Sequence, residues 1–217
     1  MTKVFMIPGL GADSRLCKNI ILPNGFECIL IEWLEPLQTD SLETYSKAIV
    51  KQYVIKNEDI LIGVSLGGIL SVEIAKQLHI SKLILISSIK TDSEAPLYFQ
   101  FFRNLPVYKV IPGGLINHLG VLIKPMFGKM LPNDLALFKS MLSNSSPVFM
   151  KWAMSAVLQW RNSTIPPNLY HIIGDKDLVF PHKNIVNPTA VIKGGTHIMV
   201  FDRADEINAL LADILNR

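Results

Sequence analysis

The sequence predicts an α/β fold, with a mostly parallel sheet of about six strands, helices on both faces and an inserted helical segment. Short apolar runs rich in β-branched residues alternate with segments of helical periodicity, a pattern typical of parallel strands joined through helices. The composition agrees, since 49% of the 217 residues are hydrophobic and 18% are charged, as expected for strands buried on both faces. This length suits one domain with a sizeable core.

The first part of the chain alternates predicted strands with predicted helices. Apolar runs predict strands at residues 4–7, 28–31, 60–62 and 82–86. A short helix is expected after the first strand, with Asp13 or Ser14 as its N-cap. Asp40, with Glu43 three positions later, predicts a capping box at the start of an amphipathic helix over residues 41–56.

Residues 89–165 break the strand and helix alternation. They are rich in Met, Phe and Trp, Pro and Gly interrupt them repeatedly, and helices are predicted with starts at residues 133–134 and 145–147. We expect a helical cap over the strand ends, inserted into a core made of residues 1–88 and 166–217. Most of its large apolar side chains should be ordinary core, but some should line an apolar cavity. The candidates for this lining are Met126, Phe127, Met130, Met150, Trp152 and Met154.

The last part of the chain returns to the sheet. Strands are predicted at residues 169–173 and 189–192, a short helix near Pro181, and a closing amphipathic helix over residues 203–216. Parallel strands end at one edge of a sheet, so the loops that follow them should meet there and form the site. Ser65 lies in one of these loops.

The segment around Ser65 carries the strongest chemical signal. Gly63, Ser65 and Gly67 form a Gly-x-Ser-x-Gly motif between an apolar strand and a helix. The motif alone is often a flexible turn, but this context is the one in which it presents a nucleophilic serine. The glycines remove Cβ atoms that would collide with neighbouring backbone, and the helix N-terminus offers N–H groups to a developing negative charge.

A serine nucleophile needs a base with a pKa near neutrality, which favours histidine, and an acid that orients it. Of five histidines, only His197 lies in a Gly-rich loop just after a strand end. The other four are explained as a helix end, a cap residue, a packed strand residue and a surface helix start: His79, His118, His171 and His182. Asp175 and Asp177 follow the preceding strand, and either could be the acid or a turn residue.

These residues and their order resemble the α/β-hydrolase family over nearly the whole chain. That family uses the order serine, acid, histidine, and its nucleophile elbow matches residues 63–67. Its Gly-x-x-Asp-x-x-Val-Pro pattern aligns the acid on Asp177 rather than Asp175, and its Gly-Gly-x-His loop aligns on His197. The resemblance therefore implies Ser65, Asp177 and His197 as a catalytic triad.

The loop at residues 8–11 resembles the family's oxyanion loop. The resemblance implies an oxyanion hole made by the backbone N–H groups of Leu10 and Leu66. Pro8 stands where the family usually has a histidine, which is a structural neighbour rather than a reacting group. The N-terminus also lacks the antiparallel strands common in the family, which implies a minimal version of the fold.

Composition and charge limit which kinds of binding partner and which cellular compartment the sequence favours. The net charge of +3 comes with no dense basic run, which argues against nucleic acid as a partner. The sequence predicts no signal peptide and no membrane span. Cys17 and Cys28 lack metal-ligand spacing and predict two free thiols in a reducing cytoplasm.

The sequence thus predicts a serine hydrolase that cleaves a small carboxylic ester with an apolar acyl or alcohol part through an acyl-enzyme. No metal or organic cofactor is implied, and the protein is expected to be a monomer or homodimer. Two alternatives stay open. The same triad supports thioester hydrolysis, C–C bond cleavage or lyase chemistry, and the fold also serves ligand-binding or signalling proteins with slow turnover.

Overall fold

The computed structural model of the chain describes residues 1–105, 124–128 and 130–217. These residues form one six-stranded sheet, in which every neighbouring pair of strands is parallel and the order is β2-β1-β3-β4-β5-β6. The predicted fold class is therefore confirmed. The strands are β1 (Thr2–Ile7), β2 (Phe26–Leu30), β3 (Ile60–Val64), β4 (Lys82–Ile86), β5 (Leu169–Gly174) and β6 (Ala190–Ile192).

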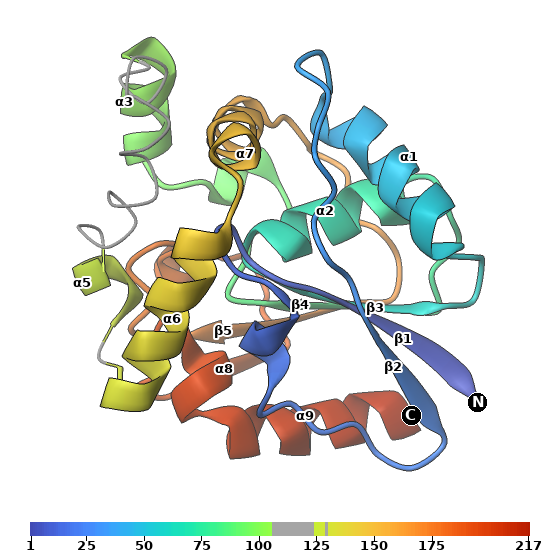
Figure 1. Cartoon of the computed structure of the whole chain (residues 1–217). Coiled ribbons are helices and arrows are strands. Elements are labelled where there is room, and N and C mark those ends of the chain that lie inside the picture. Colours follow the sequence, from blue (N-terminus) through green and yellow to red (C-terminus); the bar gives the residue numbers. More distant parts are fainter. Residues whose placement is uncertain (106–123, 129) are drawn as a thin grey trace.

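Helices cover both faces of this sheet (Figure 1). Helices α1 (Leu42–Tyr53) and α2 (Leu66–Ala75) pack together on one face, and α9 (Ala204–Asn216) runs along the other beside the short α8 (Met199–Asp202). Strand β3 is buried along its whole length, because it lies at the centre of the sheet between the two helical layers. Short 3₁₀ turns also follow β1, β4 and β5: η1 (Ser14–Cys17), η2 (Asp92–Glu94) and η4 (His182–Asn184).

Further helices lie between β4 and β5 in the sequence. They are α3 (Tyr98–Asn104), α5 (Lys124–Phe127), α6 (Pro132–Asn144) and α7 (Pro147–Gln159). Helices α6 and α7 contact the loops after β1 and β2. Lys18 Nζ lies 2.8 Å from Asp134 Oδ1, and the rings of Trp33 and Phe149 are 4.9 Å apart. Helices α6 and α7 thus pack on the carboxyl-terminal side of the sheet (Figure 1).

The predicted start and end of α1 were wrong by a few residues. Ser41, not Asp40, is the N-cap, and its hydroxyl accepts from the Thr44 N–H while the Thr44 hydroxyl accepts from the Ser41 N–H. The Asp40 carboxylate instead accepts from the Leu37 N–H, which closes the preceding turn. The helix ends at Tyr53 because the next residue adopts a left-handed conformation with φ 53°.

Other boundaries differ for equally local reasons. Helix α6 begins one residue before the predicted cap, because Pro132 occupies its first turn and Leu131 is the N-cap. Of the two predicted N-caps of the η1 turn, Asp13 and Ser14, the structure has Asp13, whose carboxylate accepts from the Arg15 N–H. The short helix α8 was not predicted. The start of α7 after Ser146 is as predicted, with the Ser146 hydroxyl accepting from the Phe149 N–H.

In the described part of the chain, no helix is both long enough and apolar enough to cross a bilayer. The two cysteines are free thiols, with Cys17 buried and Cys28 exposed. Burial raises the pKa of the Cys17 thiol to about 12, so this side chain packs as a neutral apolar group.

Candidate active site

Ser65 occupies a tight bend between β3 and α2. Its φ of 54° and ψ of −117° are unfavourable for a residue with a side chain, so the surrounding structure must hold this conformation. The flanking glycines allow the bend. A Cβ on Gly67 would lie 2.1 Å from the Ile7 carbonyl oxygen, and one on Gly63 would lie 2.4 Å from the Gly67 carbonyl oxygen. Only glycine fits at either position, which explains the spacing of the motif.

Three side chains from the ends of three strands meet in one hydrogen-bonded line. His197 Nε2 lies 2.9 Å from Ser65 Oγ, and His197 Nδ1 lies 2.9 Å from Asp177 Oδ2. The Asp177 and His197 side chains are almost completely buried, with 2% and 3% of each residue exposed. This geometry fixes one arrangement of protons, in which Nδ1–H donates to the carboxylate and Nε2 is free to accept from the serine hydroxyl.

The loops after β5 and β6 hold the acid and the histidine in place. Asp177 Oδ1 also accepts from the N–H groups of Val179 and Phe180, at 2.9 and 2.8 Å, so the carboxylate cannot rotate away from His197. Gly174 allows the two loops to pack closely, because a Cβ there would lie 2.1 Å from the Gly195 carbonyl oxygen.

The structure separates the two candidate acids. Asp175 Oδ1 accepts from the Gly194 N–H at 2.6 Å and so joins the two loops, whereas Asp177 contacts the imidazole of His197. Two of the remaining histidines lie elsewhere in the described part of the chain. His79 is exposed and 3.5 Å from Glu58, His182 begins η4, and His118 lies outside the described residues.

His171, in β5, is fully buried in a charged cluster that sequence reasoning missed. Lys90 Nζ donates to Glu94 Oε1 at 2.6 Å and to the Val186 carbonyl at 2.6 Å, and it lies 3.4 Å from His171 Nδ1. An ammonium group has no acceptor, so Nδ1 accepts and His171 is the neutral tautomer with its proton on Nε2. Burial, together with the charge of Lys90, lowers the pKa of His171 to about 4. No periodicity signals such a cluster, because its members come from separate segments.

We expect acid to destabilise the fold through His171. The pKa of this imidazole is about 4 in the folded chain against an ordinary 6.5. Between these values the unfolded chain binds a proton that the folded chain does not, so the free energy of unfolding falls as the pH drops, by about 3 kcal/mol in all. Urea denaturation at about pH 7 and about pH 4 should show this extra loss in the wild type but not in His171→Gln. Equal losses in the two proteins would contradict the prediction.

The loop after β1 approaches the Ser65 bend from the other side. A Cβ on Gly9 would lie 3.3 Å from Ser65 Cβ and 3.8 Å from its Oγ, so the backbone at this loop lies against the serine. The Leu10 N–H donates to no other group in the described ranges. Leu66 is the first residue of α2, where N–H groups have no partner within the helix. Both N–H groups predicted for the oxyanion hole thus belong to segments that flank Ser65.

Two of the six residues predicted to line the pocket lie beside His197 or the loop after β1. The Phe127 ring is 5.3 Å from the imidazole of His197 in an edge-to-face arrangement, and Phe180, which was not predicted, packs similarly at 5.5 Å. Met150 contacts the loop after β1, since a Cβ on Gly11 would lie 3.4 Å from its Cε. The surroundings of the histidine are therefore aromatic and apolar. Three others are partly buried without such a placement: Met126, Met130 and Met154.

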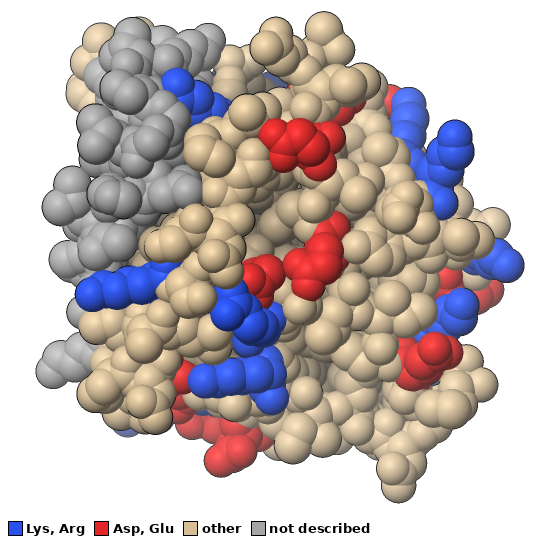
Figure 2. Space-filling model, in the orientation of Figure 1, with Lys and Arg blue, Asp and Glu red and all other residues tan. Residues whose placement is uncertain are grey.

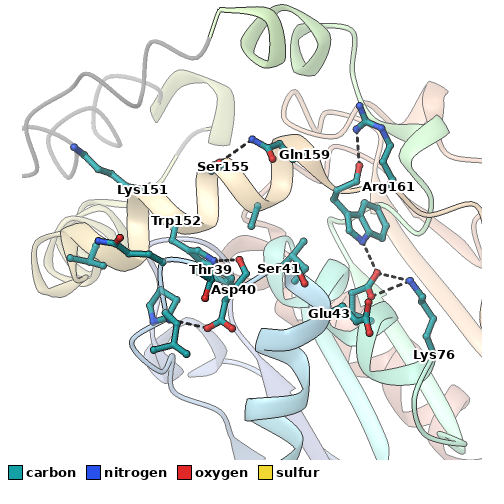
Figure 3. Close-up of a pocket in the computed structure, with 18 residues that line it drawn as sticks. Thr39, Asp40, Ser41, Glu43, Lys76, Lys151, Trp152, Ser155, Gln159 and Arg161 are labelled. Carbon is teal, nitrogen blue, oxygen red and sulfur yellow. Dashed lines mark hydrogen bonds and ion pairs between the residues drawn. The ribbon is translucent and has the colours of Figure 1, made fainter.

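Trp152 lies apart from the other lining candidates. It lines a separate cleft of about 810 Å³ between the loop before α1 and helix α7, where its Nε1–H donates to the Asp40 carbonyl oxygen (Figure 3). Trp160 also lines this cleft, and its Nε1–H donates to Glu73, which pairs with Lys76. The lining of the cleft does not include Ser65, Asp177 or His197.

The face of the molecule shown in Figure 2 carries Lys and Arg side chains and Asp and Glu side chains interspersed over it.

No protein-family model matches the sequence, and no curated protein matches it either. Within the described ranges, no group of three or more His, Cys, Asp or Glu side chains is placed to hold a metal ion.

Solved structures do match over the whole chain. An esterase from Exiguobacterium antarcticum is similar with a TM-score of 0.74 at 19% identity, covering 100% of this chain and 92% of the esterase. A thermophilic esterase from Thermogutta terrifontis gives 0.75 at 15%, covering 100% and 90%, and MenH from S. aureus gives 0.72 at 20%, covering 99% and 93%. Similarity at such low identity establishes a common architecture and leaves function to the site. The chain has the α/β-hydrolase fold.

Proposed function

We propose that this protein is a serine hydrolase that cleaves small carboxylic esters. The observation that carries the proposal is the hydrogen-bonded line from Asp177 through His197 to Ser65, with both heavy-atom distances to the imidazole at 2.9 Å. Its proton arrangement is the one that an activated serine requires. The two esterases named above support the choice of ester hydrolysis.

The reaction follows from the positions of these groups. Ser65 Oγ attacks the ester carbonyl carbon as its proton passes to His197 Nε2, and Asp177 stabilises the imidazolium that forms. His197 then gives the proton to the departing alcohol, which leaves an acyl group on Ser65. Water, deprotonated by the same imidazole, attacks the acyl-enzyme. The imidazolium then returns this proton to Ser65 Oγ as the bond to the acyl group breaks and the acid is released. The chemistry is proton transfer and acyl transfer by the chain's own side chains.

The tetrahedral intermediate carries a negative oxygen that needs hydrogen-bond donors. We assign this role to the N–H groups of Leu10 and Leu66, which lie in the two segments that flank Ser65. One well-placed donor of this kind contributes about 3–4 kcal/mol to stabilising the transition state.

The proposed substrate has an apolar acyl or alcohol part. Phe127 and Phe180 border the imidazole of His197, and Met150 borders the loop that carries Leu10. We propose that residues 89–165 act as a cap on a core made of residues 1–88 and 166–217, and that the cap supplies part of the acyl pocket. The two free thiols suit a cytoplasmic protein.

Labelling with a fluorophosphonate, followed by a series of p-nitrophenyl esters, tests this proposal. We expect covalent labelling of Ser65, located by mass spectrometry, and a kcat/KM that rises with acyl length until the apolar pocket is full. Labelling at another serine, or no hydrolysis of any ester in the series, would contradict the proposal.

A further inference from the structure

The Ser65 carbonyl oxygen has a hydrogen-bond partner outside its own helix. Ser88, just after β4, donates from its hydroxyl to this oxygen at 2.7 Å. Ser88 is fully buried, and space for its hydroxyl depends on Gly68, where a Cβ would lie 2.4 Å from Ser88 Oγ. The elbow therefore accommodates this hydroxyl at the cost of a glycine inside α2.

The carbonyl that Ser88 holds belongs to the peptide group that contains the Leu66 N–H. A peptide unit is planar and trans, so the C=O and N–H of one unit point in opposite directions. Fixing the Ser65 carbonyl on one side therefore fixes the direction of the Leu66 N–H on the other. A hydrogen bond to the carbonyl also polarises the peptide and strengthens its N–H as a donor.

Ser88 is itself held by the buried cluster around His171. His171 Nε2–H donates to the Ser88 carbonyl at 3.0 Å. On the other side of the ring, Lys90 Nζ lies 3.4 Å from His171 Nδ1. The cluster is anchored again by Glu94, whose carboxylate accepts from the Lys90 N–H at 2.9 Å and the Val186 N–H at 2.9 Å.

The two ends of the inserted segment also meet at this cluster. Asn162 Nδ2 donates to the Lys90 carbonyl at 2.8 Å, and the Asp92 N–H donates to the Asn162 carbonyl at 2.9 Å. The network thus joins the base of the insertion to the peptide that follows the serine.

We propose that Ser88 is a positioning residue for the oxyanion hole, which it aligns through the Ser65–Leu66 peptide, and that His171 is a second positioning residue that holds Ser88. This inference rests on the proposed function, since it assigns a role in the same reaction. Neither residue touches the substrate. Ser88 acts on the donor that faces the oxyanion, and His171 acts on the strand end that carries Ser88.

The test compares Ser88→Ala with Ser87→Ala. Ser87 is an equally buried neighbour whose hydroxyl has no partner in the described residues, so its removal loses no hydrogen bond. Turnover of a p-nitrophenyl ester is measured per active site, with active sites counted by fluorophosphonate labelling, so that a loss of folded protein does not count. We expect Ser88→Ala to lower kcat about tenfold at unchanged KM, because the hydrogen bond to the Ser65 carbonyl that orients the Leu66 N–H is lost. Ser87→Ala should keep both values.

A second pair of variants tests the relay. Gln can place an N–H donor where His171 Nε2 stands, whereas Leu cannot. We expect His171→Leu to lower kcat per active site about threefold, as a weakened hydrogen bond would, and His171→Gln to restore it. If Ser88→Ala does not fold, this pair alone decides, and equal kcat values for the two variants overturn the proposal.

The outcomes separate this proposal from the one on which it rests. If Ser65 is labelled and Ser88→Ala turns over at the wild-type rate per active site, the positioning role is wrong and the serine hydrolase stands. If Ser65→Ala hydrolyses the ester as fast as the wild type, the proposed function fails, and the positioning role fails with it.

Discussion

Replacing Ser65 with alanine should lower the turnover of a p-nitrophenyl ester on the order of 10⁶-fold. The alanine has no group to attack the carbonyl, and the imidazole of His197, 2.9 Å from the lost hydroxyl, then has no proton to accept. Direct attack by water aided by the oxyanion donors is all that would remain. Initial rates at saturating ester, measured with enough protein to detect slow hydrolysis, give the ratio.

Ser71→Ala is a matched control for this variant. Ser71 is a buried serine of α2, the helix that follows Ser65, and its hydroxyl donates to the Gly67 carbonyl at 2.7 Å. This variant should keep its activity, and circular dichroism should show both proteins folded. Similar turnover by Ser65→Ala and the wild type would remove Ser65 as the nucleophile.

Asp177→Asn should lower kcat on the order of 10⁴-fold while the protein stays folded. Asparagine has nearly the same shape and keeps an acceptor for the N–H groups of Val179 and Phe180. Its amide can, however, present N–H to His197 Nδ1. That would place the imidazole proton on Nε2, where it blocks acceptance of the serine proton. Steady-state kinetics with one ester, at fixed pH, measure the effect.

Asp175→Asn is the control for this substitution. It makes the same chemical change two residues away, at a carboxylate that accepts from the Gly194 N–H instead of contacting the histidine. We expect this variant to retain turnover within about threefold, since only a loop hydrogen bond is weakened. Equal losses from the two substitutions would mean that Asp177 has no special role.

The sheet could be predicted from the sequence because its signal is local. Runs such as residues 82–86 are continuously apolar, and α1 has a clear amphipathic periodicity, so much of the parallel alternation follows from short windows of sequence. The order and spacing of the glycines likewise identify the bend at Ser65, because the collisions they avoid lie within the motif and the neighbouring strand.

The predictions that were wrong also have physical causes. Asp40 and Ser41 are both good N-caps, and only the exchange of hydrogen bonds with Thr44 decides between them. Val54 ends α1 in a left-handed conformation that a β-branched residue rarely adopts, so the identity of this residue does not predict the end of the helix. Trp152 has the spacing of a core residue, and its contact with the Asp40 carbonyl depends on tertiary packing.

The serine and the histidine of the proposed site are 132 positions apart in the chain. Because they come from the ends of β3 and β6, their distance is set only when the intervening strands have been added to the sheet in the correct register. Such distant pairings form late, since a long loop must close before they gain any stabilisation. Hydrolytic competence would therefore report the completion of folding, and a partly assembled chain with normal helix content would stay inert.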